Sequence, residues 1–502
     1  MNGKGGTIPP VVLLSAAVAA CWWTWPGATV AADTSAVVIR VDVDSTAATP
    51  DGLSWETAYT SVQDGVDAAA SAGGGEVWVA EGTYTGRGYR VVTMREQVHI
   101  YGGFRGTEIA RDQRDWRLHL TLIDGEDTRG CVLGADNATL NGLAVRDGSA
   151  NSDAGLYNWD SSPHVANCTF AGNTAWHGAG MWNAWCAPSV ANCMFTGNIA
   201  TRLPGGGALF NLVDCSPTFT KCTFEDNAAL NGSGGAVHND LHCWPEFINC
   251  LFVRNTADLF GGAMWNYDTC SPSFVNCTFA ENTATEGGAV YDEAVGDLTF
   301  TNCVLWGDEP DEVSFWPKQH TVVTMTYSCV DGGYEGEGNI DADPLFVDAA
   351  GGNFRLDAAS PCIDAGCLVA EVTEDFEGDA RGFDGSAEPR GDGSDYDMGA
   401  DEYVSPHSAD TDQDRCISVR EISRVIAFYN AGAYHIDETT QDGYAPFEGP
   451  QDGAPHDSDY TPQDWAISIP EISRLVTFYN AGGYTPDPDT PDGFAPRIAD
   501  KR

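Results

Sequence analysis

The stretch Ala166-Asn-Cys-Thr-Phe-Ala-Gly-Asn173 recurs through the middle of the chain and decides the fold. Its cysteine returns at Cys193, Cys222, Cys250, Cys277 and Cys303, so copies follow one another every 25 to 29 residues. The copies consist of short alternating runs separated by Gly, Asn and Pro, which is typical of strands and bends. A repeat of this length without a helical pattern predicts a right-handed parallel β-helix, whose coils stack at the strand spacing of about 4.8 Å.

Several columns of side chains are expected to point into the coils. The Cys and the Phe of the motif face inward, because alternate residues of a strand lie on the same side. An apolar column stands two residues before each bend: Val165, Val190, Phe219, Phe247, Phe274 and Phe300. The Asn before each Cys makes a bend, since Asn tolerates the left-handed backbone conformation. Lys221 replaces this Asn in one coil.

A second motif, Gly-Gly-Ala, begins at Gly206, Gly234, Gly261 and Gly287 and precedes a further apolar column. We expect this column in the core: Leu156, Met181, Leu209, Val237, Met264 and Val290. The residue after each of them must then face outward. These residues are Tyr157, Trp182, Phe210, His238, Trp265 and Tyr291.

Five aromatic side chains and a histidine in register predict an exposed ladder. Exposed apolar stripes of this size usually mark a binding surface, and carbohydrate is the natural ligand because sugar faces stack on aromatic rings. The alternative is stacking of the rings on one another between coils, which stabilises a parallel sheet without any ligand. Both interpretations remain open from the residues alone.

Phe-x-x-Asn combined with Gly-Gly-Ala-aliphatic, over about residues 154–306, resembles the repeat of polymorphic outer-membrane adhesins within the pectate-lyase-like β-helix superfamily. Upstream, Val77-Trp-Val-Ala-Glu-Gly-Thr-Tyr84 resembles the N-terminal capping region of bacterial right-handed β-helix proteins. Downstream, Ser360-Pro-Cys-Ile-Asp-Ala-Gly366 and Met398-Gly-Ala-Asp-Glu-Tyr403 resemble the C-terminal part of the choice-of-anchor family. The resemblance implies an all-β, single-stranded solenoid of the pectin-lyase type.

The chain has 73 acidic and 25 basic residues among its 502, which gives a formal charge of −48. Such a charge excludes a nucleic-acid binder, since phosphates attract positive faces and the chain has only four lysines. It also disfavours an anionic membrane surface. Sixteen cysteines in an exported chain suggest oxidation, but Cys is also a good buried filler. We expect buried thiols with some disulfides between vertical neighbours.

The first 32 residues are typical of an export signal. Lys4 precedes an apolar run, and Val30-Ala-Ala32 offers a small-residue cleavage site. The alternative is a lipoprotein signal, in which Cys21 would carry the lipid. No later stretch approaches 18 apolar residues, so no transmembrane anchor is expected. A secreted or cell-surface protein follows from either interpretation.

A calcium-binding tail is predicted after Tyr403. The segment 410–421 fills the ligand positions of an EF-hand loop. The predicted ligands are the carboxylates of Asp410, Asp412 and Asp414, the carbonyl of Cys416, Ser418 directly or through water, and bidentate Glu421. Arg415 stands where the loop usually has glycine.

The tail repeats itself at an offset of 50 residues, as in Glu421-Ile-Ser-Arg424 and Glu471-Ile-Ser-Arg474. The second loop is a poorer match, and a one-residue insertion is needed to make Asp459 its first ligand, with Asp464 and Glu471. No helix precedes the first loop, so the module resembles dockerin more than a calmodulin-type hand. That resemblance implies a docking role toward a surface protein.

The predicted domains are the signal at 1–32, a cap with the first coils at 33–153, regular coils at 154–306, further coils and a cap at 307–404, and the EF-hand or dockerin-like α-helical module at 405–502. We expect the β-helix to recognise a polysaccharide or cell-surface glycan, or another surface partner. The alternative is a polysaccharide lyase or glycoside hydrolase acting in the groove. Its catalytic candidates are the acids Asp214, Asp240 and Asp268 and the bases Lys221 and Arg254. An enzyme would gather carboxylates around one of these bases.

Overall fold

The computed structural model describes residues 37–151, 154–316, 322–385 and 390–497, apart from 414, 438–439, 441, 448, 452–453, 461–462 and 488–489. The predicted signal, with its lipid site at Cys21, lies outside these residues, as does the predicted ligand Asp414. Within the described ranges, no helix has the length and apolar character that crossing a membrane requires.

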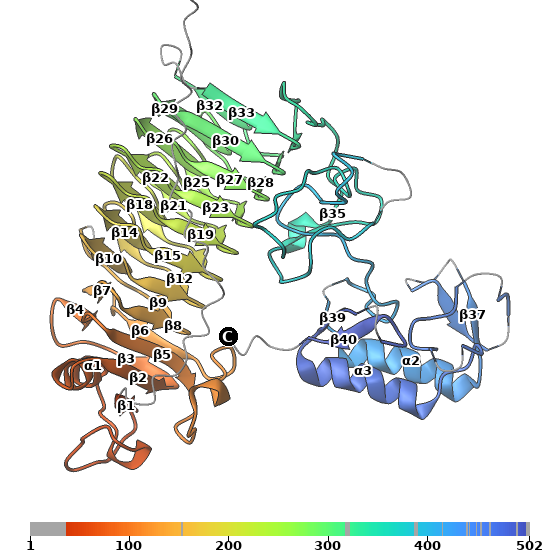
Figure 1. Ribbon diagram of the computed structural model, residues 1–502, viewed down its shortest axis with the longest axis horizontal. Helices are drawn as coiled ribbons and strands as arrows, with labels where there is room; N and C mark the ends of the chain where they lie inside the picture. Colours follow the sequence, from red (N-terminus) through yellow and green to blue (C-terminus); the bar gives the residue numbers. More distant parts are fainter. Residues whose placement is uncertain are drawn as a thin grey trace, which may run out of the picture. The chain divides into compact units, whose positions relative to one another are not determined.

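Three long parallel sheets run along a stack of coils, because each coil adds one strand to each sheet (Figure 1). Sheet A consists of β1 (Val37–Val41), β2 (Gly75–Ala80), β5 (Val98–Phe104), β8 (Thr139–Asn141), β11 (His164–Ala166), β15 (Ser189–Ala191), β19 (Thr218–Thr220), β23 (Glu246–Ile248), β27 (Ser273–Val275), β30 (Asp297–Thr301) and β33 (Val322–Thr326). Sheet B consists of β3 (Gly82–Tyr84), β6 (Thr121–Asp124), β9 (Ala144–Arg146), β12 (Thr169–Ala171), β16 (Met194–Thr196), β20 (Thr223–Glu225), β24 (Leu251–Val253), β28 (Thr278–Ala280), β31 (Val304–Trp306) and β34 (Cys329–Val330).

Sheet C carries the Gly-Gly-Ala side of each coil. It consists of β4 (Arg90–Thr93), β7 (Gly130–Leu133), β10 (Leu156–Trp159), β14 (Met181–Ala184), β18 (Leu209–Leu212), β22 (Val237–Asp240), β26 (Met264–Asp268), β29 (Val290–Ala294) and β32 (Val313–Phe315). A short sheet D lies between B and C along the chain, with β13 (Thr174–Ala175), β17 (Ile199–Ala200), β21 (Ala228–Ala229) and β25 (Thr256–Ala257). The architecture is the predicted parallel β-helix.

Helix α1 (Val62–Ser71) covers the core at the N-terminal end. Ser61 caps its first turn by accepting a hydrogen bond from the amide of Asp64. Val62, Val66 and Ala69 are buried on one face, at the helical spacing that the apolar residues of an amphipathic helix follow. The helix contacts β1 and β2, the first strands of sheet A.

The predicted inward columns are confirmed. All six residues of the Val165 column, the motif cysteines from Cys168 to Cys303 and the aliphatic column from Leu156 to Val290 are buried. The motif phenylalanines stack face to face from coil to coil, with ring centroids 4.6 to 5.0 Å apart. The stacking follows directly from the strict register, since each Phe is paired with the Phe of the next coil.

Two columns of buried asparagine, which the sequence analysis did not predict, run inside the coils. One follows the outward residues of sheet C, and each side-chain amide donates to the next at 2.8 to 2.9 Å: Asn158, Asn183, Asn211, Asn239 and Asn266. The other is the Asn of Phe-x-x-Asn: Asn173, Asn198, Asn227, Asn255 and Asn282. This second column ends on the buried carboxylate of Asp308, 2.7 Å from the Asn282 amide.

The bend before each motif cysteine has the predicted left-handed backbone. Its φ angle is 50° to 56° at all six positions, and Lys221 adopts it too at 55°. The first glycine of Gly-Gly-Ala also has positive φ, and a Cβ at Gly234 would lie 2.2 Å from the carbonyl oxygen of Val237. Glycine is therefore required there by space as well as by φ.

All fifteen cysteines within the described part of the chain are free thiols. Thirteen are buried, and Cys367 and Cys416 are half-buried. The predicted burial is confirmed, but no disulfide joins vertical neighbours among these residues. The thiols point to backbone carbonyls instead, as when Cys193 Sγ lies 3.2 Å from the carbonyl oxygen of Ala191.

After β34, the last strand of sheet B, the chain forms an irregular segment with one hairpin. The hairpin consists of β35 (Phe346–Asp348) and β36 (Asn353–Leu356). The tail then contains two similar halves, each a helix followed by a hairpin. The first has α2 (Val419–Ala431), β37 (Tyr434–Ile436) and β38 (Tyr444–Pro446), and the second has α3 (Ile469–Ala481), β39 (Tyr484–Pro486) and β40 (Phe494–Pro496). Each helix begins after a serine and ends at a glycine with left-handed φ, Gly432 or Gly482.

Candidate functional site

The six residues predicted as an exposed ladder lie in register on sheet C, but the prediction that they are exposed is wrong. Tyr157 is half-buried and the other five are buried, with Trp265 the most exposed of them at 9%. The rings contact one another: Tyr157 stacks on Trp182 at 4.6 Å, and His238 lies edge-on to Trp265 at 4.3 Å. Stacking between coils, the alternative interpretation, accounts for the column, and its role in ligand binding stays a prediction.

The segments that lead into each Gly-Gly-Ala motif bury this column. The ring of Phe260 stacks on Tyr291 at 4.5 Å, and His177 lies 5.6 Å from Phe210. Because the motif has no side chains at its glycines, its backbone closes directly over the next coil. Strand alternation gave the direction of these side chains correctly, but it could not reveal that the chain folds back over them.

Burial leaves His238 without a hydrogen-bond partner on either ring nitrogen. Its pKa is held well below the usual value, first by burial and then by the neighbouring His177. The imidazole is therefore a neutral packing element between Phe210 and Trp265.

Other aromatic side chains are exposed at the outward ends of the sheet C strands and in the turns that lead to sheet A; we call this region the C–A rim. Trp159 is 50% exposed, Trp185 43%, Trp244 47% and Tyr267 41%. The ring of Trp159 stacks on the buried Trp182 with nearly parallel planes and centroids 5.7 Å apart. Trp185 packs edge-on against Trp159, with centroids 4.6 Å apart. Trp182 of the buried column thus supports Trp159 from below.

Carboxylates are interspersed with these rings. Asp160 and Asp214 are exposed, and Asp240, Asp268 and Glu293 are half-buried. Burial, and then the charge of Asp268, raise the pKa of Asp240, whose Oδ1 has no hydrogen-bond partner.

The two basic catalytic candidates lie elsewhere. Lys221 Nζ pairs with Glu374 at 3.0 Å, from a bend between sheets A and B. Arg254 follows sheet B and pairs with Glu225 and with Asp226, the latter at 3.3 Å. Asp214, Asp240 and Asp268 lie at sheet C, so the described residues do not bring the predicted acids and bases together.

The first predicted loop brings three of its predicted calcium ligands together. One carboxylate oxygen from each of Asp410, Asp412 and Glu421 lies within 4.8 Å of the others. Asp410 and Glu421 are buried, and Asp412 is exposed. Ser418 caps α2, since its hydroxyl accepts from the amide of Glu421 at 3.3 Å. These hard oxygen donors fit Ca²⁺.

Arg415 has the backbone of the glycine it replaces. Its φ is 60°, and its amide donates to Asp410 Oδ2 at 2.8 Å, which closes the loop. Its guanidinium is buried and pairs with Asp379, within a group of acids that follows the β35–β36 hairpin. That ion pair explains an arginine at a position where glycine would be less strained. Cys416 is half-buried, with its thiol 3.4 Å from the carbonyl oxygen of Gly482.

The second loop has the same kind of backbone hydrogen bonds as the first, once the one-residue insertion is allowed. Asp459 accepts from the amides of Asp464 and Trp465, at 3.1 and 2.7 Å, as Asp410 accepts from Arg415. Glu471 accepts from the amides of Tyr460 and Ser468, at 3.1 and 2.7 Å. Asp459, Asp464 and Glu471 do not form a three-carboxylate group among the described residues.

The two halves exchange a tyrosine. Tyr484 of the second half donates to Asp410 Oδ2, and Tyr434 of the first half donates to Asp459 Oδ2, both at 2.7 Å. Each hydroxyl also accepts a backbone amide, from His407 or His456. The pKa values of both tyrosines are raised, mainly by burial. The loops are therefore joined through one pseudo-symmetric core.

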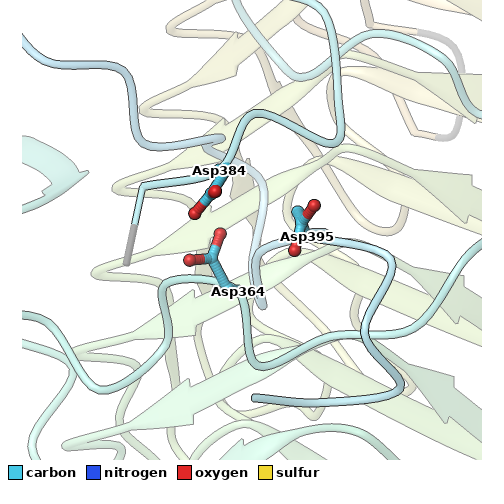
Figure 2. A group of neighbouring side chains, drawn as sticks. All are labelled: Asp364, Asp384 and Asp395. Atoms are coloured by element: carbon cyan, nitrogen blue, oxygen red, sulfur yellow. The ribbon is translucent and has the colours of Figure 1, made fainter. Parts of the chain in front are cut away.

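A further group of acids precedes the tail. Asp364, Asp384 and Asp395 turn toward one another, with carboxylate oxygens within 4.8 Å (Figure 2). This group has no signature in the sequence, because its members come from three separate irregular turns. Acidic residues often gather without an ion, so we assign no cation here.

Comparison with known proteins identifies the coils. Residues 123–284 match the family model of the right handed beta helix region, and residues 276–293 match the repeat of the Chlamydia polymorphic membrane protein. The coils form a right-handed β-helix. The β-helix resembles a crystal structure of the pectate lyase Pel9A with 15% identity and a TM-score of 0.41, over 73% of this chain and 96% of that one. A search of curated protein sequences finds no match.

Proposed function

We propose that this protein is displayed outside the cell and binds polysaccharide through the C–A rim of its β-helix. The observation that carries the proposal is the group of exposed rings at Trp159, Trp185, Trp244 and Tyr267. Large exposed aromatic groups on a soluble domain usually mark a binding surface. The polymorphic membrane protein repeat at 276–293 supports a surface location.

The rim suits a long polymer. Parallel strands place equivalent residues about 4.8 Å apart along the stack, which is close to the length of one sugar ring. Trp159 and Trp185 stand on adjacent coils, and Tyr267 stands further along the same edge. The rings therefore offer faces to several sugars of one chain, and the support of Trp159 by Trp182 lowers the entropic cost of binding at that ring.

The same proposal gives the tail a calcium-stabilised docking role. Calcium held by Asp410, Asp412 and Glu421 would neutralise three neighbouring carboxylates and fix the loop before α2. The two helices expose apolar residues at equivalent positions, Val419 with Ile469 and Tyr429 with Tyr479. Such a repeated apolar face supports docking to a surface protein.

Retention on insoluble polysaccharides, measured together with release of reducing and unsaturated ends, tests the binding role. We expect retention without product, and Trp159→Ala or Trp185→Ala should weaken it roughly five- to tenfold. Tyr479→Ala, an exposed ring on α3, is the matched control and should leave retention unchanged. Product release, or retention that ignores both tryptophans, would refute the proposal.

Calorimetric titration with calcium tests the tail. At a calcium concentration 100 times the dissociation constant, binding should stabilise the folded tail by about 2.7 kcal/mol. Glu421→Gln should abolish the first binding event, because it removes one of two bidentate oxygens. Glu471→Gln, in the weaker loop, is the matched control. An unchanged isotherm for Glu421→Gln would refute the first site.

A further inference from the structure

The charge on the C–A rim narrows the kind of polysaccharide that it suits. The exposed rings alternate with Asp160, Asp214, Asp240, Asp268 and Glu293. The strands and turns that form the rim contain neither lysine nor arginine: 156–160, 181–187, 209–216, 237–245, 264–272 and 290–297. The rim is thus both aromatic and uniformly negative.

The nearby arginine and lysine side chains do not make the rim positive. Arg90 lies over the ring of Tyr157, at 5.3 Å from its centroid, on the N-terminal side of the rim. Arg202 stacks on Trp176 at 4.0 Å, in the segment before Gly-Gly-Ala. Lys221 and Arg254 are paired with acids on the other side of the bends. A glycan of uronic acids or sulfated sugars would therefore meet repulsion from the rim and from a chain of net charge −48.

The acids are also placed to contact a bound sugar. Asp240 stands two coils from Ala184, in the outward column that begins with Trp159. Asp240 and Asp268 are both half-buried, and the charge of Asp268 raises the pKa of Asp240. An ammonium group bound at the exposed part of these carboxylates would relieve the repulsion between them.

Resting on the proposed function, we infer that the C–A rim binds a polysaccharide with free amino groups, whose sugar faces stack on Trp159 and Trp185 and whose ammonium groups pair with Asp240 and Asp268. Stacking supplies contact area and the carboxylates supply selection by charge. Because the carboxylates are negative, the rim should repel acidic polymers.

The test compares one polymer in two chemical states, a β-linked glucosamine polymer and the same polymer after N-acetylation. We expect retention of the amino form to exceed that of the acetylated form about tenfold at low salt. The difference should shrink when salt is raised from about 0.05 M to about 0.5 M, because the Debye length shortens. A polyuronate of similar length should not be retained.

Two variants separate this inference from the proposed function. The double variant Asp240→Asn with Asp268→Asn should lose the preference for the amino form but keep binding that depends on Trp159. Asp112→Asn, which changes an exposed acid outside the rim, is the matched control. Equal retention of both forms, weakened by Trp159→Ala, would overturn the charge selection and leave polysaccharide binding intact. No retention of any polymer would overturn both.

Discussion

Replacing Asp308 by asparagine should stabilise the β-helix in a pH-dependent way. Asp308 ends the inner asparagine column, where its Oδ1 accepts from the backbone amide of Asn282 at 2.6 Å and from its side chain at 2.7 Å. Burial raises the pKa of Asp308 to about 6, and burial with the charge of Asp308 raises that of Glu312 to about 11. At pH 7 the pair therefore consists of a buried carboxylate and a protonated Glu312.

The magnitude follows from the difference between the folded and unfolded pKa of Asp308. Because the folded value of about 6 exceeds the ordinary 3.8, the folded state keeps a proton that the unfolded chain has lost. The contribution of Asp308 to the free energy of unfolding thus falls as the pH rises from about 4 to about 6, by at most about 3 kcal/mol. Asparagine keeps the Oδ1 acceptor and never ionises, so Asp308→Asn should recover this amount above pH 6.

Thermal unfolding followed by tryptophan fluorescence at pH 4 and pH 7.5 measures the effect. If residues 37–502 unfold together, about 3 kcal/mol corresponds to a rise of roughly 3 °C at pH 7.5, with little change at pH 4. Glu312→Gln should also stabilise the protein at pH 7.5, because the folded state keeps a proton on Glu312 that the unfolded chain has lost above the ordinary pKa of 4.5. A variant Asp308→Asn that is less stable at pH 7.5, or equally shifted at both pH values, would refute the reasoning.

The columns and glycines inside the coils give two further predictions. Asn227→Leu should destabilise the β-helix by about 2 to 4 kcal/mol in denaturant titration, because it leaves buried polar partners unsatisfied on both sides. Asn151→Leu, at an exposed position without positive φ, should have a small effect. Gly234→Ala should be far more destabilising than Gly197→Ala, since both have positive φ but only Gly234 has backbone within 3 Å of the new Cβ; equal losses would show that φ alone matters.

The repeat made most of the fold predictable from the sequence. Residues that recur at a fixed spacing must occupy equivalent places in each coil, so the Cys, Phe and aliphatic columns were assigned to the core correctly. The left-handed bends followed from asparagine's backbone preference and hold even at Lys221. These features depend on local geometry, which a single sequence records.

Three features could not be predicted because they depend on contacts between segments. The burial of the ladder from Tyr157 to Tyr291 depends on the path of the chain before Gly-Gly-Ala. The inward direction of the asparagine after each ladder residue follows from strand alternation, but a polar core column is unfavourable unless every amide finds its neighbour. Only the stacked register provides those partners. The swapped tyrosines of the tail depend in the same way on how its two halves meet.

The columns of the β-helix also separate structural from functional positions. Where a column repeats one residue, as with the asparagines and phenylalanines, each side chain contacts the equivalent side chain in the coils before and after it. The outward column that begins with Trp159 does not repeat: its paired positions hold Trp159, Ala184, Leu212 and Asp240 in four successive coils. Trp159 stacks on Trp182 of the next coil, but the paired Ala184 has no ring, so this contact is not repeated along the column. We therefore expect substitutions of Trp159 and Asp240 to change binding more than folding, since neither side chain belongs to a repeated contact between coils.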